Sequence, residues 1–204
     1  VNDFEDTDPT IPSVAAICVY PNFVSTVRET LTAENVKVAS VSGCFPASQS
    51  FIEVKLAETA LAVSDGADEI DIVLNMGKFL SGDYEAAATE IEEQIAAAKG
   101  ATVKVILETG ALKTPENIRR ATILSLFCGA HFVKTSTGKG YPGASLEAAY
   151  TMCKVLKQYY GLFGEVRGIK LSGGIRTTED AVKYYCLIET LLGKEWLTPA
   201  YFRI

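Results

Sequence analysis

The sequence has few of the features that a disulfide framework, a zinc site or a membrane span requires. Five cysteines are scattered along 204 residues without a Cys-x-x-Cys pair, and there is a single histidine. Disulfide-rich domains need closely spaced cysteines, and structural zinc sites need clustered cysteine and histidine ligands. No apolar run reaches the roughly 18 residues of a membrane-spanning helix. We therefore expect a cytoplasmic protein with reduced thiols, no metal and no membrane partner.

Basic charge is also scarce, since the formal net charge is −6. An acidic surface repels nucleic acids and anionic lipids, so we expect no nucleic-acid partner. The length suits one globular domain with a large core, and no linker or low-complexity segment divides the chain. These features predict a single domain over residues 1–204.

Short apolar runs alternate with amphipathic segments at a spacing of roughly 30 residues. Unbroken apolar runs suit strands of a parallel sheet, which is covered on both faces. Ser50 and Glu53 have the spacing of a capping box, ahead of a helix that carries Ile52, Leu56, Ala60 and Val63 and ends near Gly66. Strands are predicted over 14–20, 36–41, 69–74, 102–108, 131–135 and 169–171. Further helices are predicted over 22–32, 84–99, 114–129, 145–160 (closed by Gly161) and 177–192.

Strand and helix alternation without a linker leaves two architectures, an open doubly wound sheet and a closed barrel of eight units. Two features favour the barrel. The phosphate motifs GxGxxG and GxxxxGK[ST] of open sheets are missing. Polar residues recur at the ends of successive strands, as expected where all strands open into one mouth: Asp71, Glu108, Lys134 and Lys170.

The sequence therefore predicts an α/β fold of the (β/α)8 TIM-barrel type that is incomplete at both ends. Residues 1–13 have the character of a tail and a loop, and residues 201–204 resemble the start of a seventh strand. Because a barrel that lacks strands leaves unpaired edges, we expect a first strand and helix before Val1. We likewise expect the end of the last unit to follow Ile204.

Two lysines lie in otherwise apolar strands, and each precedes a glycine-rich loop with a further cation. Lys134 precedes Gly138-Lys139-Gly140, and Lys170 precedes Gly173-Gly174-Ile175-Arg176. One such lysine could reach water along its stem from a strand end. Two that meet in a barrel mouth disfavour each other's charge, and burial lowers the pKa of both. A neutral amine attacks carbonyl groups, so the pair predicts covalent imine catalysis.

Asp71 is the predicted proton carrier, acting directly or through a water molecule. Its alternative role is a core ion pair with Lys104 or Lys170. The histidine, His131, starts its strand at the opposite end of the barrel, which indicates a structural role. The two glycine loops offer backbone amides and two cations, Lys139 and Arg176, which predicts a phosphate site. Either loop alone could be a plain turn.

Four motifs together resemble the 2-deoxyribose-5-phosphate aldolase family, whose members are class I aldolases with a TIM-barrel fold. The motifs are VKTSTGKG around Lys134, IKLSGGIRT around Lys170, GADEIDIVLN around Asp71 and AAICVYP around Cys18, and the similarity runs from about Ala15 to Arg203. The resemblance implies reversible cleavage of 2-deoxy-D-ribose 5-phosphate, a small phosphorylated sugar, to D-glyceraldehyde 3-phosphate and acetaldehyde. It implies neither a metal nor another cofactor.

By the same resemblance, Lys134 forms the Schiff base, Lys170 lowers the pKa of Lys134, and Asp71 relays protons. Cys18 matches a position that aldehyde side products attack in some members, and its alternative is a small buried hydrophobe. Homodimers or larger homo-oligomers are frequent in the family. The residues implied in binding the substrate and its phosphate are Thr137, Gly138, Lys139, Gly173, Gly174 and Arg176.

Two other functions remain open at this point. The imine chemistry could act on another phosphorylated sugar or on a keto acid, because donor specificity depends on pocket shape. The fold could also serve as a catalytically silent binding protein. The lysine pair and the acid argue against that second reading, because a binding module has no reason to keep them in the mouth.

Overall fold

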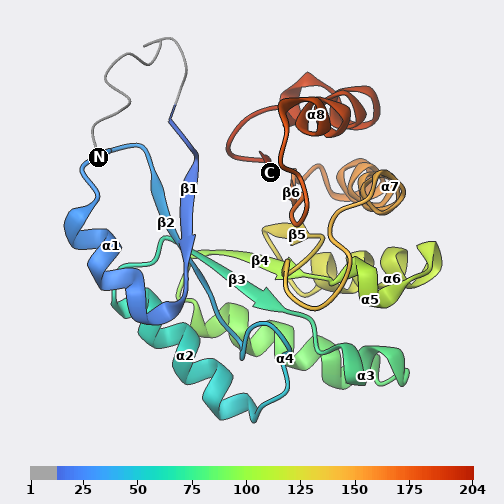
Figure 1. The fold of residues 1–204 in the computed structure, drawn as a ribbon. Coiled ribbons are helices and arrows are strands. Elements are labelled where there is room, and N and C mark those ends of the chain that lie inside the picture. Colours follow the sequence, from blue (N-terminus) through green and yellow to red (C-terminus); the bar gives the residue numbers. More distant parts are fainter. Residues whose placement is uncertain (1–12) are drawn as a thin grey trace.

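The computed structural model describes residues 13–204 of the chain. Every neighbouring pair of strands in these residues is parallel, and the order of strands in the sheet follows the sequence. Open doubly wound sheets reverse their order at a switch point, whereas a sheet wound in one direction curls into a barrel. The predicted α/β barrel is confirmed, and Figure 1 shows the curled sheet with helices on its outer side.

The predicted alternation of strands and helices is also confirmed, with shorter strands than expected. The strands are β1 (Ala16–Val19), β2 (Lys37–Val41), β3 (Glu69–Val73), β4 (Thr102–Ile106), β5 (Phe132–Lys134), β6 (Gly168–Lys170) and β7 (Phe202–Arg203). The helices are α1 (Val24–Thr30), α2 (Ile52–Ser64), α3 (Met76–Leu80), α4 (Tyr84–Ala97), α5 (Thr109–Leu112), α6 (Pro115–Phe127), α7 (Leu146–Phe163) and α8 (Thr178–Leu192). Single 3-10 turns lie at Pro21–Phe23 and Lys194–Trp196.

β1 and β7 are the two edges of the sheet that residues 13–204 form, and they do not pair with each other in this part of the chain. The presence of β7 agrees with the expectation that residues 201–204 begin a further strand. The predicted tail falls almost entirely on residues 1–12, which lie outside the described part. The strand and helix expected before Val1 lie outside it as well.

Side chains at the predicted helix starts act as caps in three cases. Thr114, Ser145 and Thr177 each accept a hydrogen bond from the backbone N–H three residues later. Such caps satisfy amides that have no partner in the first helical turn. The capping box predicted at Ser50 is wrong, because α2 begins only at Ile52 and has no side-chain cap.

The predicted end of α7 at Gly161 is also wrong. The helix continues to Phe163, and Gly164 ends it with a left-handed φ of 69°. Aromatic packing gives the reason for the extension. The Phe163 ring lies 4.7 Å from the Tyr159 ring and 5.7 Å from the Phe127 ring of α6, measured between centroids. These contacts outweigh the small helix penalty of one glycine.

The alternation of side chains along the strands separates an apolar outer layer from a charged interior. In β3, Ile70 and Ile72 belong to the hydrophobic core that packs under the helices. Glu69 and Asp71, on the other face of the strand, form ion pairs with Lys104 of β4. Barrel interiors are usually filled by branched apolar side chains. The charged interior is therefore the candidate functional site of this fold.

Candidate active site

Asp71 lies at the centre of the charged interior. It is completely buried, and its two oxygens face three ammonium groups. Oδ1 is 2.7 Å from Nζ of Lys104, and Oδ2 is 2.7 Å from Nζ of Lys134 and 3.4 Å from Nζ of Lys170. Strand register accounts for the arrangement, because Asp71 pairs with Lys104 across β3 and β4, and Lys134 pairs with Lys170 across β5 and β6. The structure thus brings together the acid and the two lysines that the sequence singled out.

The alternative considered for Asp71, a core ion pair with Lys104, is present at the same time. The sequence indicated Lys104 only as this alternative partner of Asp71 and did not include it among the site residues. A second carboxylate continues the network below Asp71. Glu69 lies 2.6 Å from Nζ of Lys104 and 2.9 Å from Nη2 of Arg203 in β7. The network joins four cationic side chains to two carboxylates, and this excess of positive charge favours an anionic ligand.

The network shifts the pKa values of its members in opposite directions. Burial would raise the pKa of Asp71, but the charges of Lys134, Lys104 and Lys170 hold it well below its usual value. Burial lowers the pKa of Lys170, Asp71 opposes that shift, and the charge of Lys134 lowers it further. The site therefore combines a carboxylate that stays ionised with the amine of Lys170, which is displaced toward its neutral form and lies on the same carboxylate oxygen as Lys134.

The two glycine-rich loops predicted to bind phosphate lie against each other. The hydroxyl of Ser172 donates a hydrogen bond to the carbonyl oxygen of Ser136 at 2.7 Å. A side chain added at Gly173 would meet the backbone of Gly143 at 2.9 Å, so the close approach requires glycine there. The loops after β5 and β6 thus form one surface at the mouth of the barrel.

The predicted phosphate residues are at the exposed rim of that surface. Gly138, Gly173 and Gly174 have φ values of 76°, 86° and 87°, which glycine adopts without strain. Lys139 is exposed, and its Nζ lies 5.9 Å from the centre of the Tyr20 ring, which follows β1. Arg176 is exposed at the end of the loop after β6. The structure brings the two loops together and leaves both cations accessible.

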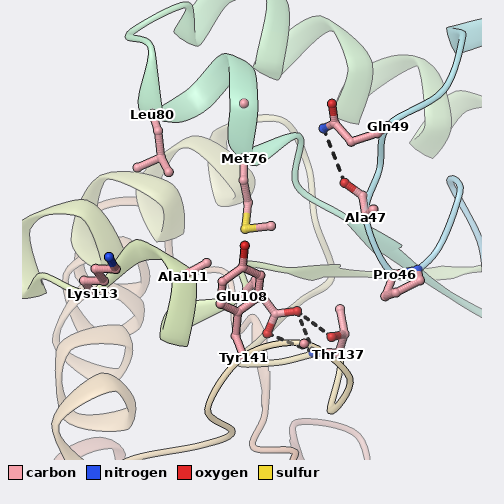
Figure 2. Close-up of a pocket in the computed structure, with 12 residues that line it drawn as sticks. Pro46, Ala47, Gln49, Met76, Leu80, Glu108, Ala111, Lys113, Thr137 and Tyr141 are labelled. Atoms are coloured by element: carbon pink, nitrogen blue, oxygen red, sulfur yellow. Dashed lines mark hydrogen bonds between the residues drawn. The ribbon is translucent and has the colours of Figure 1, made fainter.

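Glu108 is a further site residue, which the sequence showed only as a polar strand end. Its side chain is buried directly after β4, and its carboxylate accepts hydrogen bonds from the backbone N–H of Thr137 at 3.2 Å and from the Thr137 hydroxyl at 2.5 Å. Both residues line a cavity of about 600 Å³ that the loops after β2, β3, β4 and β5 surround. Figure 2 shows the two side chains joined at one wall of this cavity.

Cys18 in β1 is exposed, so its interpretation as a small buried hydrophobe is wrong. Although the residue is exposed, neighbouring atoms partly desolvate its thiol, and this desolvation raises the pKa of the thiol. The negative charge of Asp71 adds to the effect, and the charges of Lys134 and Lys170 oppose it. These interactions place the thiol within electrostatic reach of the lysines, and the raised pKa makes the reactive thiolate scarce near neutral pH.

His131 lies directly before β5, at the end of the strand opposite Lys134. Its Nδ1 accepts a hydrogen bond from the backbone N–H of Val103 at 3.0 Å, and burial followed by the charge of Arg167 lowers its pKa. The ring therefore links β4 and β5 in its neutral form, in agreement with the predicted structural role. Within residues 13–204, the hydrogen bond to the histidine ring comes from Val103, at the end of the strand away from the amines.

Two further searches concern residues 13–204 only. In this range, no helix combines the length and the apolar character that crossing a membrane requires. The same range holds no group of three or more His, Cys, Asp and Glu side chains arranged to bind a metal ion. All five cysteines are free thiols.

Known proteins of similar sequence and structure agree with this geometry. The model of the DeoC/LacD family aldolase matches residues 8–185. The deoxyribose-phosphate aldolases of Homo sapiens and Mus musculus are 40% and 39% identical to the chain over 194 residues. Each alignment covers 94% of this chain and 61% of the relative, so the chain spans about 61% of the length of these curated relatives.

A solved structure gives the same result at the level of the fold. The deoxyribose phosphate aldolase from Aeropyrum pernix, described as a unique tetrameric structure, matches with a TM-score of 0.72 and 30% sequence identity. The match covers 92% of this chain and 71% of that one. Since the family model covers well over half of the residues, the chain belongs to the DeoC/LacD family of aldolases.

Proposed function

We propose that this chain catalyses the reversible cleavage of 2-deoxy-D-ribose 5-phosphate to D-glyceraldehyde 3-phosphate and acetaldehyde, through an imine on Lys134. The observation that carries the proposal is the buried Asp71, whose Oδ2 lies 2.7 Å from Nζ of Lys134 and 3.4 Å from Nζ of Lys170. The names of the human and mouse relatives support the same substrate.

In the proposed reaction, the neutral amine of Lys134 adds to the C1 aldehyde of the open-chain sugar, and the oxygen leaves as water. The resulting iminium accepts the electron pair of the C2–C3 bond when that bond breaks. Asp71, directly or through water, takes the proton of the C3 hydroxyl and returns a proton to C2 of the enamine. Hydrolysis of the imine then releases acetaldehyde and restores the amine of Lys134.

Lys170 serves this cycle as a neighbouring cation that disfavours a second charge on Lys134. The position of Lys170 supports the role, because its ammonium shares one carboxylate oxygen with Lys134. In this proposal, the cations and backbone amides at the rim hold the substrate phosphate. The contact between the two loops and the exposure of their cations support this role. The proposed phosphate-binding residues are Gly138, Lys139, Gly173, Gly174 and Arg176.

The proposal extends to the state of the protein. We place it in the cytoplasm as a single-domain subunit of a homo-oligomer that works without a metal or another cofactor. Five free thiols and the tetrameric relative from Aeropyrum pernix support this. Cys18, exposed near the amines, is the proposed site of slow modification by aldehydes, because its raised pKa limits the thiolate.

Trapping the imine tests the function. Incubation with acetaldehyde and borohydride should add one ethyl group to the protein, and peptide mass spectrometry should locate it on Lys134. Lys134→Ala should lose both the adduct and the release of glyceraldehyde 3-phosphate in a coupled assay. Lys78→Met, which removes a lysine of α3 outside the site, is the matched control and should keep both. A wild-type protein of unchanged mass after the treatment would rule out imine catalysis.

A further inference from the structure

Lys104 is the most enclosed of the three lysines around Asp71. Its side chain is 1% exposed, compared with 7% for Lys134 and 15% for Lys170. Its Nζ lies 2.7 Å from Oδ1 of Asp71 and 2.6 Å from Oε2 of Glu69, so it is held between two carboxylates. This enclosure leaves no room for a carbonyl substrate at Lys104, and any part that it plays in the reaction must pass through its neighbours.

The ring of Phe132 gives this ammonium group a further contact. Nζ of Lys104 lies 5.9 Å from the ring centre, within the range of a cation–π interaction. The guanidinium of Arg203 lies 5.8 Å from the same ring, and its Nη2 lies 2.9 Å from Oε1 of Glu69. A side chain at Gly168 would collide with the Phe132 ring, so the glycine gives the ring its space. Lys104 therefore has a fixed position in the interior of the sheet.

The same contacts keep Lys104 charged. Burial would lower its pKa, but the charges of Asp71 and Glu69 outweigh burial and raise that pKa. Lys170 shows the opposite balance. Burial lowers its pKa, the charge of Asp71 opposes this shift, and the charges of Lys134 and Lys104 lower the pKa further. Lys104 therefore remains a cation over the pH range in which its neighbour titrates.

We propose that Lys104 is a positioning residue of the aldolase reaction, which acts through Asp71 and lowers the pH at which the reactive amine becomes neutral. This inference rests on the proposed function. Lys104 takes Oδ1 of Asp71, so Lys134 and Lys170 meet the same second oxygen. Its charge also repels the charge of both amines, because all three ammonium groups contact one carboxylate. Lys104 thus adds to the effect that is proposed for Lys170.

The other titratable or charged groups near the amines come from the two edge strands and from the start of β3. In residues 13–204 they are Cys18 of β1, Glu69 of β3 and Arg203 of β7. The thiol of Cys18 has a raised pKa, so it carries no charge near neutral pH. Glu69 and Arg203 pair with each other, and their opposite charges partly cancel at the amines. Besides Lys170, Lys104 is therefore the cation in direct contact with Asp71 that does not react.

The pH dependence of kcat/KM for cleavage of 2-deoxy-D-ribose 5-phosphate tests the inference, because its acid limb reports the ionisation of groups in the free enzyme. Samples quenched at each pH are assayed for glyceraldehyde 3-phosphate at one common pH. The titration of the substrate phosphate is the same for every variant. Lys104→Met removes the charge, so the midpoint of the acid limb should rise by about one pH unit.

The shape of that pH profile separates the proposed role from a merely structural one. Below both midpoints, Lys104→Met should have a kcat/KM about tenfold lower than the wild type, and the difference should shrink at alkaline pH. A structural role alone would lower kcat/KM by one factor at every pH and leave the midpoint in place. Lys104→Arg keeps the charge and should keep the wild-type midpoint, even where its rate is lower.

Glu69→Gln provides a variant of opposite sign. It removes the negative charge that pairs with Lys104, so the midpoint should move to lower pH. Lys78→Met, in α3 outside the site, is the matched control and should keep the wild-type midpoint. These two variants show whether charge next to Asp71, and not any loss of an ion pair, moves the midpoint.

A Lys104→Met protein with the wild-type midpoint overturns the inference, as does a Lys104→Arg protein whose midpoint moves as far as that of Lys104→Met. If Lys104→Met does not fold, a midpoint in Glu69→Gln that stays in place or rises overturns it instead. A wild-type protein that gives no borohydride adduct contradicts the proposed function, and this inference fails with it. A wild-type protein that forms the adduct, together with unmoved midpoints in the variants, refutes this inference alone.

Discussion

The molecule buries two clusters of lysines around a carboxylate, and the two clusters differ in how the oxygens are shared. The barrel cluster lies inside the sheet and consists of Asp71, Lys104, Lys134 and Lys170. The helix cluster lies between α2, α3 and α4 and consists of Glu90, Lys55, Lys78 and Asn75. Each cluster contains one lysine that is almost completely buried, Lys104 in the barrel cluster and Lys55 in the helix cluster, so a buried lysine does not by itself distinguish them.

In the helix cluster every ammonium has oxygens of its own. Lys55 is fully buried and donates to the carbonyl oxygen of Ser48 at 2.7 Å, to the Ser48 hydroxyl at 3.0 Å and to Oε2 of Glu90 at 2.7 Å. Those three bonds use all three ammonium hydrogens. Lys78 pairs with the other Glu90 oxygen at 2.7 Å, and this hydrogen bond raises the pKa of Lys78. The ammonium groups of the helix cluster therefore have the partners that a structural role requires.

In the barrel cluster two ammonium groups share one oxygen of Asp71, and the third ammonium takes the other oxygen. Burial lowers the pKa of Lys170, and the charge of Lys134 lowers it further. Burial would also lower the pKa of Lys104, but the charges of Asp71 and Glu69 outweigh it and raise that pKa. The two clusters therefore differ in how oxygens are shared, because only in the barrel cluster do two ammonium groups, those of Lys134 and Lys170, meet one carboxylate oxygen. The following predictions test this difference, beginning with the largest expected effect.

Removing the carboxylate should affect the barrel cluster most. Asp71→Asn leaves Lys134 and Lys170 without a counter-charge, while Lys104 keeps Glu69. Losing one partner of a buried ion pair costs about 3–5 kcal/mol of unfolding free energy. Glu90→Gln leaves Lys55 with both Ser48 oxygens and an amide oxygen, so we expect about 1–3 kcal/mol. Urea denaturation at pH 7 measures both values. Equal losses in the two variants would contradict the comparison.

Activity provides the control for that experiment. Asp71→Asn should abolish turnover even at temperatures where the variant remains folded, because the proton carrier is gone. Glu90→Gln should still form the borohydride-trapped adduct on Lys134, since Glu90 contacts only the helix cluster. Loss of the adduct in Glu90→Gln would show that the two clusters are not independent.

The lowered pKa of Lys170 makes the stability of the folded protein depend on pH. The pKa of Lys170 is lower in the folded protein than its ordinary value of 10.5. At a pH between the folded pKa and 10.5, Lys170 is therefore protonated in the unfolded chain and neutral in the folded protein. The destabilisation from Lys170 is thus fully present below its folded pKa and disappears as the pH rises to about 10.5. Lys170→Met should therefore be more stable than the wild type near neutral pH, and this advantage should shrink as the pH rises, measured by urea denaturation from pH 7 to 10.

Lys183 of α8 is the matched control for the pH series. Its hydrogen bonds to Asp180 and Glu179 raise its pKa, so the stability that it contributes is present below 10.5 and lost as the pH rises above that value. Between pH 7 and 10, the difference in unfolding free energy between Lys183→Met and the wild type should therefore stay constant. The difference between Lys170→Met and the wild type should change over the same range. Parallel pH curves for the wild type and Lys170→Met would contradict the lowered pKa of Lys170.

Sequence periodicity predicted the parts of this structure that depend on burial patterns. Charged residues in apolar strands, such as Lys134 and Lys170, indicated a shared mouth because strands of a barrel end at the same rim. The alternation of side chains along β3 sets Glu69 and Asp71 on one face, where both pair with Lys104. Strand register, in contrast, depends on packing between distant segments, so the sequence left the partner of Asp71 open between Lys104 and Lys170, and only the register of β3 and β4 sets Asp71 opposite Lys104.

Local signals failed where a tertiary contact decided the conformation. The apolar residues of α2 predicted its inner face, but the fully buried positions include Lys55 and Thr59, because Glu90 of α4 binds the ammonium of Lys55. The left-handed backbone of Glu108 is unusual for its residue type and depends on contacts with a loop 29 residues away. Such features could be found only once the fold had brought these segments together.

The smallest effect is expected within the helix cluster, at Lys78. Its side chain is 39% exposed, so its ammonium remains hydrated when the pair with Glu90 is absent, and Lys78→Met should cost less than about 1 kcal/mol of unfolding free energy. Lys55→Met is the matched variant on the same carboxylate. It should cost several times more, because it leaves the buried carbonyl oxygen of Ser48 without this donor. Equal urea midpoints for the two variants would mean that solvent access does not separate them. The distinction between a satisfied buried lysine and a dispensable surface lysine would then have to be given up.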